Sequence, residues 1–204
     1  MVEEVRIYVE GGGDGKAGKT EIRRGFGEFL SQLRDHARSQ RIRWSVFACG
    51  SRRDAFDDFR TAIRTNPNVF NVLLVDSDGP VSDAPWRHLQ NTVGWQKPEA
   101  DDDQCQLMVQ VMEAWLVADV EALKHFYGQD FRETAIPRQQ NVEQIEKTDL
   151  ERALDNATRH TKKGRYHKIK HGAKLLAKVD PAIVREKAQH CKQLFTTLTS
   201  RMTP

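Results

Sequence analysis

The chain has 204 residues, with 32 lysines and arginines against 29 aspartates and glutamates, and 38% of its residues are apolar. This composition excludes collagen-like, disulfide-stapled and disordered proteins, and no apolar stretch approaches the roughly 20 residues that span a bilayer. A chain of this length suits one α/β core with an appendage. Cys49, Cys105 and Cys191 show no CxxC spacing, which predicts free thiols, and the acidic start at residues 1–4 predicts a cytosolic protein that contacts no membrane.

The first half of the chain alternates between predicted strands and helices. Strands are predicted at residues 5–9, 44–49 and 70–75, separated by helices at 21–39 and 55–63, the second stopped by Asn66-Pro67. The third strand is continuously apolar, which is typical of a strand buried in a parallel sheet. With a fourth strand at 105–112, the pattern predicts an α/β fold with a Rossmann-like, mainly parallel four-stranded sheet flanked by helices.

The second half is predicted to be mostly helical. Residues 79–104 are rich in proline and acidic residues and predict a long loop, and a helix is expected from residue 113 to about 127. The remainder reads as helical, with breaks at Pro137 and at Asp180-Pro181. We therefore expect an α/β core over residues 1–128 and a basic helical extension over 129–204 that packs on this core.

Acidic residues follow three of the four predicted strands. Glu10 closes the first, Asp76 and Asp78 close the third, and Glu113 closes the fourth. Ligands bind at the carboxyl ends of strands in such sheets, and residues two apart in extended chain project to the same side. Clustered carboxylates without Cys or His suit Mg²⁺ or Mn²⁺, which can polarise a phosphoryl oxygen and activate water. The alternative is structural: the aspartates cap a turn and Glu113 merely starts a helix.

Positive charge is concentrated in the last quarter of the chain. Residues 151–204 carry 13 lysines and arginines against 4 acids, whereas residues 1–150 carry 19 against 25. This segment suits a polyanion such as RNA or DNA, and it equally suits a solvated helix face or local ion pairs. The candidate phosphate contacts are Arg52, Arg53, Lys162, Lys163, Arg165, Lys168 and Lys170. Tyr166, His167 and His171 either contact a nucleotide or pack against the protein.

Residues 13–20 offer a competing hypothesis. They read GDGKAGKT and match the phosphate-binding pattern G-x-x-x-x-G-K-[ST] between a strand and a helix. The nucleotide-binding residues would be Gly13, Gly18, Lys19 and Thr20, with the lysine on the phosphates and the threonine on Mg²⁺. Residues 10–12 intervene after the strand, however, and the hypothesis leaves the other acidic residues without roles.

Several segments in order along the chain carry a resemblance to a known family. They are VEGGGD at residues 9–14, ACGSR at 48–52, LVDSD at 74–78, MEAW at 112–115 and YHK at 166–168. The chain resembles the TOPRIM superfamily and, more closely, a bacterial TOPRIM-like family. The resemblance implies Mg²⁺-dependent phosphodiester chemistry, with Glu10 as general acid or base, Asp76 and Asp78 as metal ligands, and Glu113 as a further ligand.

The resemblance also implies a biological setting. The leading hypothesis is a metal-dependent nuclease that acts on RNA or DNA. One relative is the nuclease effector of a bacterial anti-phage system and works with an ATPase partner, so the resemblance also implies that such a partner and such a role are possible here. A third hypothesis is an inactive pocket in a regulatory subunit of a larger complex, because a fold does not guarantee an activity. The sequence does not choose between RNA and DNA, and it admits an oligomer.

Overall fold

The computed structural model describes residues 2–13, 15–66 and 68–203. Four strands form one parallel sheet in the order β2-β1-β3-β4, which confirms the predicted α/β fold. The strands are β1 (Glu4–Glu10), β2 (Arg43–Gly50), β3 (Phe70–Asp76) and β4 (Cys105–Met108). Every residue of β3 is buried, as its continuous apolar sequence predicts for a strand covered on both faces.

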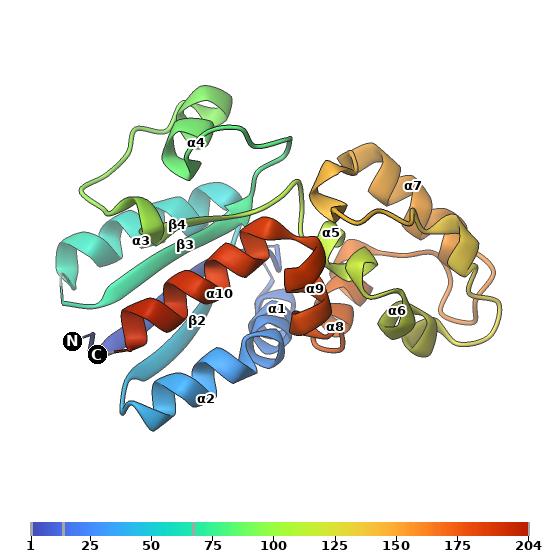
Figure 1. Ribbon diagram of the computed structural model, residues 1–204, viewed down its shortest axis with the longest axis horizontal. Coiled ribbons are helices and arrows are strands. Elements are labelled where there is room, and N and C mark those ends of the chain that lie inside the picture. Colours follow the sequence, from blue (N-terminus) through green and yellow to red (C-terminus); the bar gives the residue numbers. More distant parts are fainter. Residues whose placement is uncertain (1, 14, 67, 204) are drawn as a thin grey trace.

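Helices cover both faces of the sheet and its carboxyl end. On one face lie α3 (Arg52–Thr65) and α4 (Pro85–Val93), and on the other lie α1 (Lys16–Phe29), α2 (Ser31–Ser39) and α10 (Gln189–Met202). Beyond the carboxyl ends of the strands, on the right of Figure 1, lie α5 (Glu113–Ala118), α6 (Val120–Tyr127), α7 (Lys147–Thr158), α8 (Ala173–Leu176) and α9 (Pro181–Lys187). A π-helical turn at Lys168–Gly172 leads into α8.

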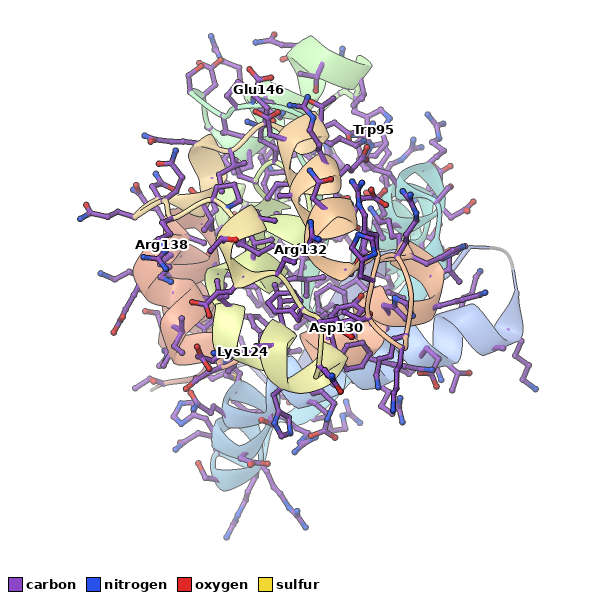
Figure 2. All side chains as sticks on the ribbon, turned by 90° about the vertical axis from the view of Figure 1, so that its right-hand side faces the viewer. Trp95, Lys124, Asp130, Arg132, Arg138 and Glu146 are labelled. Carbon is purple, nitrogen blue, oxygen red and sulfur yellow. The ribbon has the colours of Figure 1, made fainter. Side chains whose placement is uncertain are left out.

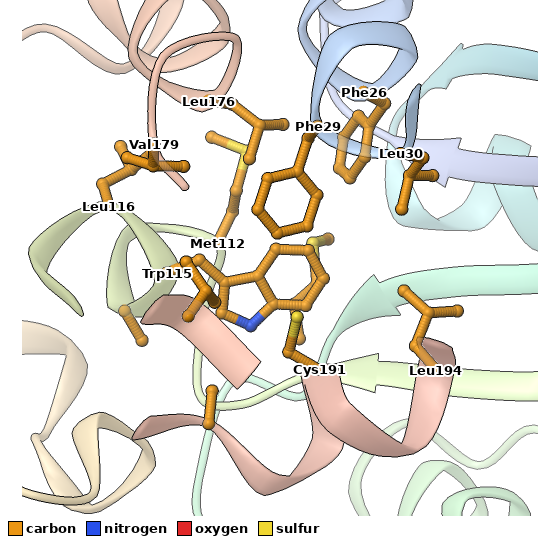
Figure 3. Close-up of a cluster of buried hydrophobic side chains, with 14 of the residues drawn as sticks. Phe26, Phe29, Leu30, Met112, Trp115, Leu116, Leu176, Val179, Cys191 and Leu194 are labelled. Carbon is orange, nitrogen blue, oxygen red and sulfur yellow. The ribbon is translucent and has the colours of Figure 1, made fainter. Parts of the chain in front are cut away.

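One hydrophobic cluster connects the sheet to the helices that follow it. Trp115 of α5 is fully buried and stacks on Phe29 of α1, with ring centroids 5.1 Å apart. Phe29 in turn meets Phe195 of α10 edge-on at 5.9 Å, and Figure 3 shows Leu176 and Cys191 in the same cluster. Large aromatic side chains dominate core energetics, so this cluster joins residues on both sides of position 128.

Asp119 makes a second connection of this kind. Its buried carboxylate accepts the backbone N–H of Ala122 at 3.1 Å and that of Asp180 at 2.9 Å. The first bond caps the amino end of α6, and the second holds the residue that precedes α9. One side chain therefore fixes two helix starts that are far apart in the sequence.

Several element boundaries differ from the predictions. The helix expected at 21–39 begins earlier, at Lys16, and is divided at Leu30 into α1 and α2. The fourth strand ends at Met108 rather than at residue 112, and the helix after it breaks at Asp119.

The predicted loop at 79–104 contains helix α4. Pro85 occupies the first turn of that helix, where no backbone N–H is needed, and Gly94 closes it in a left-handed conformation. Three residues that enter the predictions, Met1, Asp14 and Pro67, lie outside the described part of the chain.

The end of the molecule that α6 and α7 form is charged. Figure 2 looks onto this end and shows Lys124, Arg132 and Arg138 directed outward around it. All three cysteines are buried and free, as predicted. Among the described residues, no helix has the length and apolar character needed to cross a membrane.

Candidate functional site

The carboxyl ends of two neighbouring strands place Glu10 and Asp76 next to each other. The backbone N–H of Asp76 donates to Oε2 of Glu10 at 3.2 Å, across the β1–β3 pair. Glu113, the first residue of α5, is linked to this pair by Lys168. The Nζ of Lys168 lies 3.3 Å from Oδ2 of Asp76 and 3.5 Å from Oε2 of Glu113. The structure thus brings three of the four predicted acids together around one lysine.

Asp76 lies at the centre of this group and is only 3% exposed. The pKa of Asp76 is raised to about 7, chiefly by burial. The neighbouring Glu10 and Glu113 also raise this pKa, and Lys168 opposes the shift. Oδ1 of Asp76 accepts the backbone N–H of Met112 at 2.8 Å. Burial also raises the pKa of Glu10 above its ordinary value. These shifts are those of carboxylates that lack enough positive charge around them.

Glu113 is a buried carboxylate with one oxygen unsatisfied. The hydroxyl of Tyr166 donates to Oε1 at 2.9 Å, whereas Oε2 has no hydrogen-bond partner in the described chain. Burial and the nearby Glu113 raise the pKa of Tyr166 well above its ordinary value, so the phenol remains a donor. The nearest positive group to this oxygen is Nζ of Lys168 at 3.5 Å, and a buried oxygen without a hydrogen bond costs free energy, which favours a ligand role over a purely structural one.

Asp78 does not join the other acids. The strand ends at Asp76, and the positive φ of 56° at Asp78 turns the chain away from the pocket. Its carboxylate instead lies 2.9 Å from Nη1 of Arg52 and 2.9 Å from Nζ of Lys147. Asp78 is thus engaged by Arg52 and Lys147 rather than by Lys168, although its charge still raises the pKa of Glu10, and its role as a metal ligand stays a prediction.

The acids are not arranged as a ready metal site. Within residues 2–13, 15–66 and 68–203, no group of three or more His, Cys, Asp or Glu side chains is placed to hold a metal ion. The reason is visible in the contacts: Lys168 lies between Asp76 and Glu113, and Asp78 is engaged by Arg52 and Lys147.

A small cavity opens beside the acidic group. Its volume is about 180 Å³, and it is lined by Glu10, Asp76 and Lys168 together with the glycine loop at residues 11–13. Each of these glycines has a positive φ, which side-chain-bearing residues rarely adopt. The loop also packs on α1 so closely that a Cβ at Gly18 would collide with the loop backbone. Glycine is therefore required on both sides of this contact.

The nucleotide-binding hypothesis is not tested by this geometry, which differs from the pattern in one respect. Helix α1 begins at Lys16, two residues before Gly18, and the backbone N–H of Lys19 is already donated to the carbonyl of Gly15 at 3.1 Å. The Thr20 hydroxyl donates to the carbonyl of Lys16 at 2.9 Å. Gly13 is exposed in the glycine loop. The hypothesis stays a prediction, with fewer free backbone amides than the pattern implies.

Of the predicted phosphate contacts, Arg52 and Lys168 lie at the acidic group itself. Arg52 begins α3 and donates to the carbonyl of Asp76 at 3.3 Å, in addition to its ion pair with Asp78. Burial lowers the pKa of Lys168, but the negative charges of Asp76, Glu113 and Glu10 together raise this pKa by more, so the net shift is upward. Both side chains are therefore cationic partners of the acids.

The other predicted contacts lie on the surface in two different states. Arg53 pairs with Asp57 at 2.8 Å, and Arg165 pairs with Asp155 at 2.7 Å, so both guanidinium groups already have an acidic partner. By contrast, Lys162 and Lys170 are exposed and form no ion pair with any residue that the structure describes. Lys163 lies over the ring of Phe126, 5.2 Å from its centroid.

The aromatic and histidine neighbours of the basic segment mostly pack within the protein. The Tyr127 hydroxyl and Nδ1 of His171 are 3.0 Å apart, and burial lowers the pKa of His171. His167 is exposed. The contacts of Tyr166 and Lys147 with the acids were missed, because neither residue stands near an acid in the sequence.

These features define an α/β protein whose parallel sheet carries a small acidic pocket at its carboxyl edge. A family model matches residues 9–199, and the chain belongs to that family, which is described as a domain of unknown function, DUF4276. A search of curated proteins and a search of solved structures each found no match.

Proposed function

We propose that this protein is a Mg²⁺- or Mn²⁺-dependent nuclease of the TOPRIM type that hydrolyses phosphodiester bonds in RNA or DNA. The observation that carries the proposal is the convergence of Glu10, Asp76 and Glu113 at the carboxyl edge of the sheet, where the buried Oε2 of Glu113 accepts no hydrogen bond within the described residues and faces only the ammonium group of Lys168 at 3.5 Å. Ligand sites of open parallel sheets lie at this edge. We place this activity in the cytosol.

The donor set fits a hard divalent cation. Three carboxylates from separate elements offer only oxygen, and their mutual repulsion would be relieved by an ion of charge +2. We assign Glu10, Asp76 and Glu113 as the residues that would hold it. Such an ion supplies polarisation of a phosphoryl oxygen and activation of a water molecule. Burial raises the pKa of Glu10 above its ordinary value, and a raised pKa makes a carboxylate a better proton acceptor, as a general base requires.

The cationic residues around the pocket have two roles in this proposal. Arg52 and Lys147, held at the rim by Asp78, would contact the phosphate backbone close to the scissile bond. Farther out, Lys162, Lys163 and Lys170 would bind phosphates without reading sequence. Affinity for RNA or DNA should therefore fall steeply as salt is added, and replacing these three lysines with alanine should reduce the slope by about 2–3. A slope unchanged by that triple variant would remove them from the interface.

A nuclease assay with matched acid variants tests the proposal. Labelled single- and double-stranded RNA and DNA are incubated with Mn²⁺ or Mg²⁺, with EDTA as the metal-free control. Glu10→Gln and Asp76→Ala should abolish cleavage, whereas Asp35→Asn, an exposed change on α2, should leave it intact. Cleavage that persists in both pocket variants would refute the assignment.

A regulatory subunit without nuclease activity is the second candidate. The observation that favours it is the position of Lys168, which already places a positive charge among the acids. In that case calorimetry should detect no binding of Mn²⁺ or Mg²⁺ to the wild-type protein. Both candidates agree with an ATPase partner and a role in anti-phage defence, which the family resemblance supports.

A further inference from the structure

We propose that Lys168 is the resident cation of the acidic pocket and that its ammonium group must leave before a divalent ion can bind there. The inference rests on the proposed function, because it assigns the metal to the same acids. It concerns how that site is controlled, and it makes Lys168 a positioning residue whose withdrawal opens the pocket.

The first argument is that the ammonium group and a metal ion would use the same oxygens. Asp76 directs Oδ1 to the N–H of Met112, and Glu113 directs Oε1 to the hydroxyl of Tyr166. The remaining oxygen of each carboxylate faces Nζ of Lys168: Oδ2 of Asp76 lies 3.3 Å from it, and Oε2 of Glu113 lies 3.5 Å from it. The positions that a cation would take are therefore those that the lysine now holds.

The second argument is electrostatic. A divalent ion binds carboxylate oxygens at about 2.0–2.6 Å, which would bring it within a few ångströms of the ammonium group. Repulsion between like charges at such a distance is strong away from bulk water. The Asp76 and Glu113 side chains are each only 5% exposed, so solvent screens charges at their oxygens weakly, although it reaches the 52% exposed side chain of Lys168. The lysine and the metal ion therefore exclude each other.

The third argument is that Lys168 can leave without disturbing the core. Its side chain is 52% exposed, and it lies on the π-helical turn Lys168–Gly172, where the next residue, Ile169, is 65% exposed. Turns of this kind are often found at functional sites. The flanking residues hold the backbone, because Tyr166 bonds to Glu113 and His171 bonds to Tyr127. A change of rotamer at Lys168 is therefore enough to free the pocket.

Calorimetric titration with Mn²⁺ tests this exchange. Lys168→Met keeps the aliphatic stem and removes the charge, and Lys174→Met makes the same change on an exposed lysine of α8 to which no binding role is assigned. We expect Lys168→Met to bind Mn²⁺ at least about tenfold more tightly than the wild type, and Lys174→Met to stay within about twofold. Thermal melts should agree: Mn²⁺ should raise the melting temperature of Lys168→Met more than that of the wild type.

The outcomes separate this proposal from the proposed function. If the wild type and Lys168→Met bind Mn²⁺ equally well, or the variant binds less tightly, the exchange is refuted while the metal site stands. If neither protein binds Mn²⁺, both the metal site and the exchange are refuted. If only Lys168→Met binds, the exchange is supported and the wild type is held closed by its own lysine, and the nuclease assay then decides between the two candidate functions. A fold defect in the variant would appear in its metal-free melt, and Lys168→Gln then repeats the titration.

Discussion

Replacing Asp76 with asparagine should stabilise the metal-free protein increasingly as the pH rises. The native pKa of Asp76 is about 7, against an ordinary value of 3.8, so between these values the folded state binds more protons than the unfolded state. The contribution of Asp76 to stability is therefore fully present below about pH 4 and is lost as the pH rises through about 7. Asparagine keeps a similar shape and an acceptor for the N–H of Met112, but it cannot ionise.

The magnitude follows from the two pKa values. From about pH 5 to about pH 8, the cost of folding with an ionised Asp76 grows by roughly 2–3 kcal/mol. The difference in unfolding free energy between Asp76→Asn and the wild type should rise by that amount over this interval. The attraction of Lys168 acts on the ionised form of Asp76 and is already included in the pKa of about 7, so it adds no separate contribution to this difference.

Urea unfolding in EDTA at the two pH values provides the measurement. Asp35→Asn is the matched control, because it removes an exposed carboxylate on α2, and it should show no such change. A difference for Asp76→Asn that stays constant or falls as the pH rises would show that the pocket solvates this carboxylate well, and the reasoning about charge deficit would be wrong.

Two further predictions concern the support of the pocket. A Cβ at Gly25 would lie 2.6 Å from the carbonyl oxygen of Ala173, so Gly25→Ala should lower the free energy of unfolding by about 1–3 kcal/mol in chemical denaturation. A Cβ at Gly27 on the same helix would meet nothing within 4 Å, so Gly27→Ala should raise the free energy of unfolding by about 0.5–1 kcal/mol. Equal effects at the two glycines would contradict the close contact between α1 and α8. Tyr166→Phe removes the hydrogen-bond donor to Oε1 of Glu113, so it should lower the free energy of unfolding by about 1–3 kcal/mol in the same assay. An unchanged free energy of unfolding would mean that water replaces the phenol as the donor.

The sheet could be predicted from the sequence because its signals are local. Alternating apolar strands and amphipathic helices predict a parallel sheet, and the all-apolar segment at 70–75 predicts its buried centre. Helix α4 escaped prediction because Pro85 reads as a break in sequence, although it is compatible with a first helical turn. The division at Leu30 has no glycine or proline to mark it, and it depends on how α1 and α2 pack against β2.

The candidate site could be predicted only in part. Glu10 and Asp76 were expected to meet, because neighbouring parallel strands end at the same edge. The turn at Asp78 could not be foreseen, since one residue with positive φ redirects its side chain. The contact of Lys168 with Asp76 joins residues 92 positions apart, and the sequence alone predicts a phosphate contact for this lysine because it lies in a basic segment. Only tertiary packing decides whether such a lysine faces solvent or an acid.

The way the chain is joined around Trp115 and Asp119 limits how its parts can be studied. A fragment ending near Gly128 would lose Phe195 and Leu176 from the aromatic cluster, and it would lose the second backbone partner of Asp119. Deletion mapping would therefore confuse loss of a basic surface with loss of a folded protein. Single substitutions at exposed lysines are the sound way to separate recognition of a polyanion from integrity of the fold.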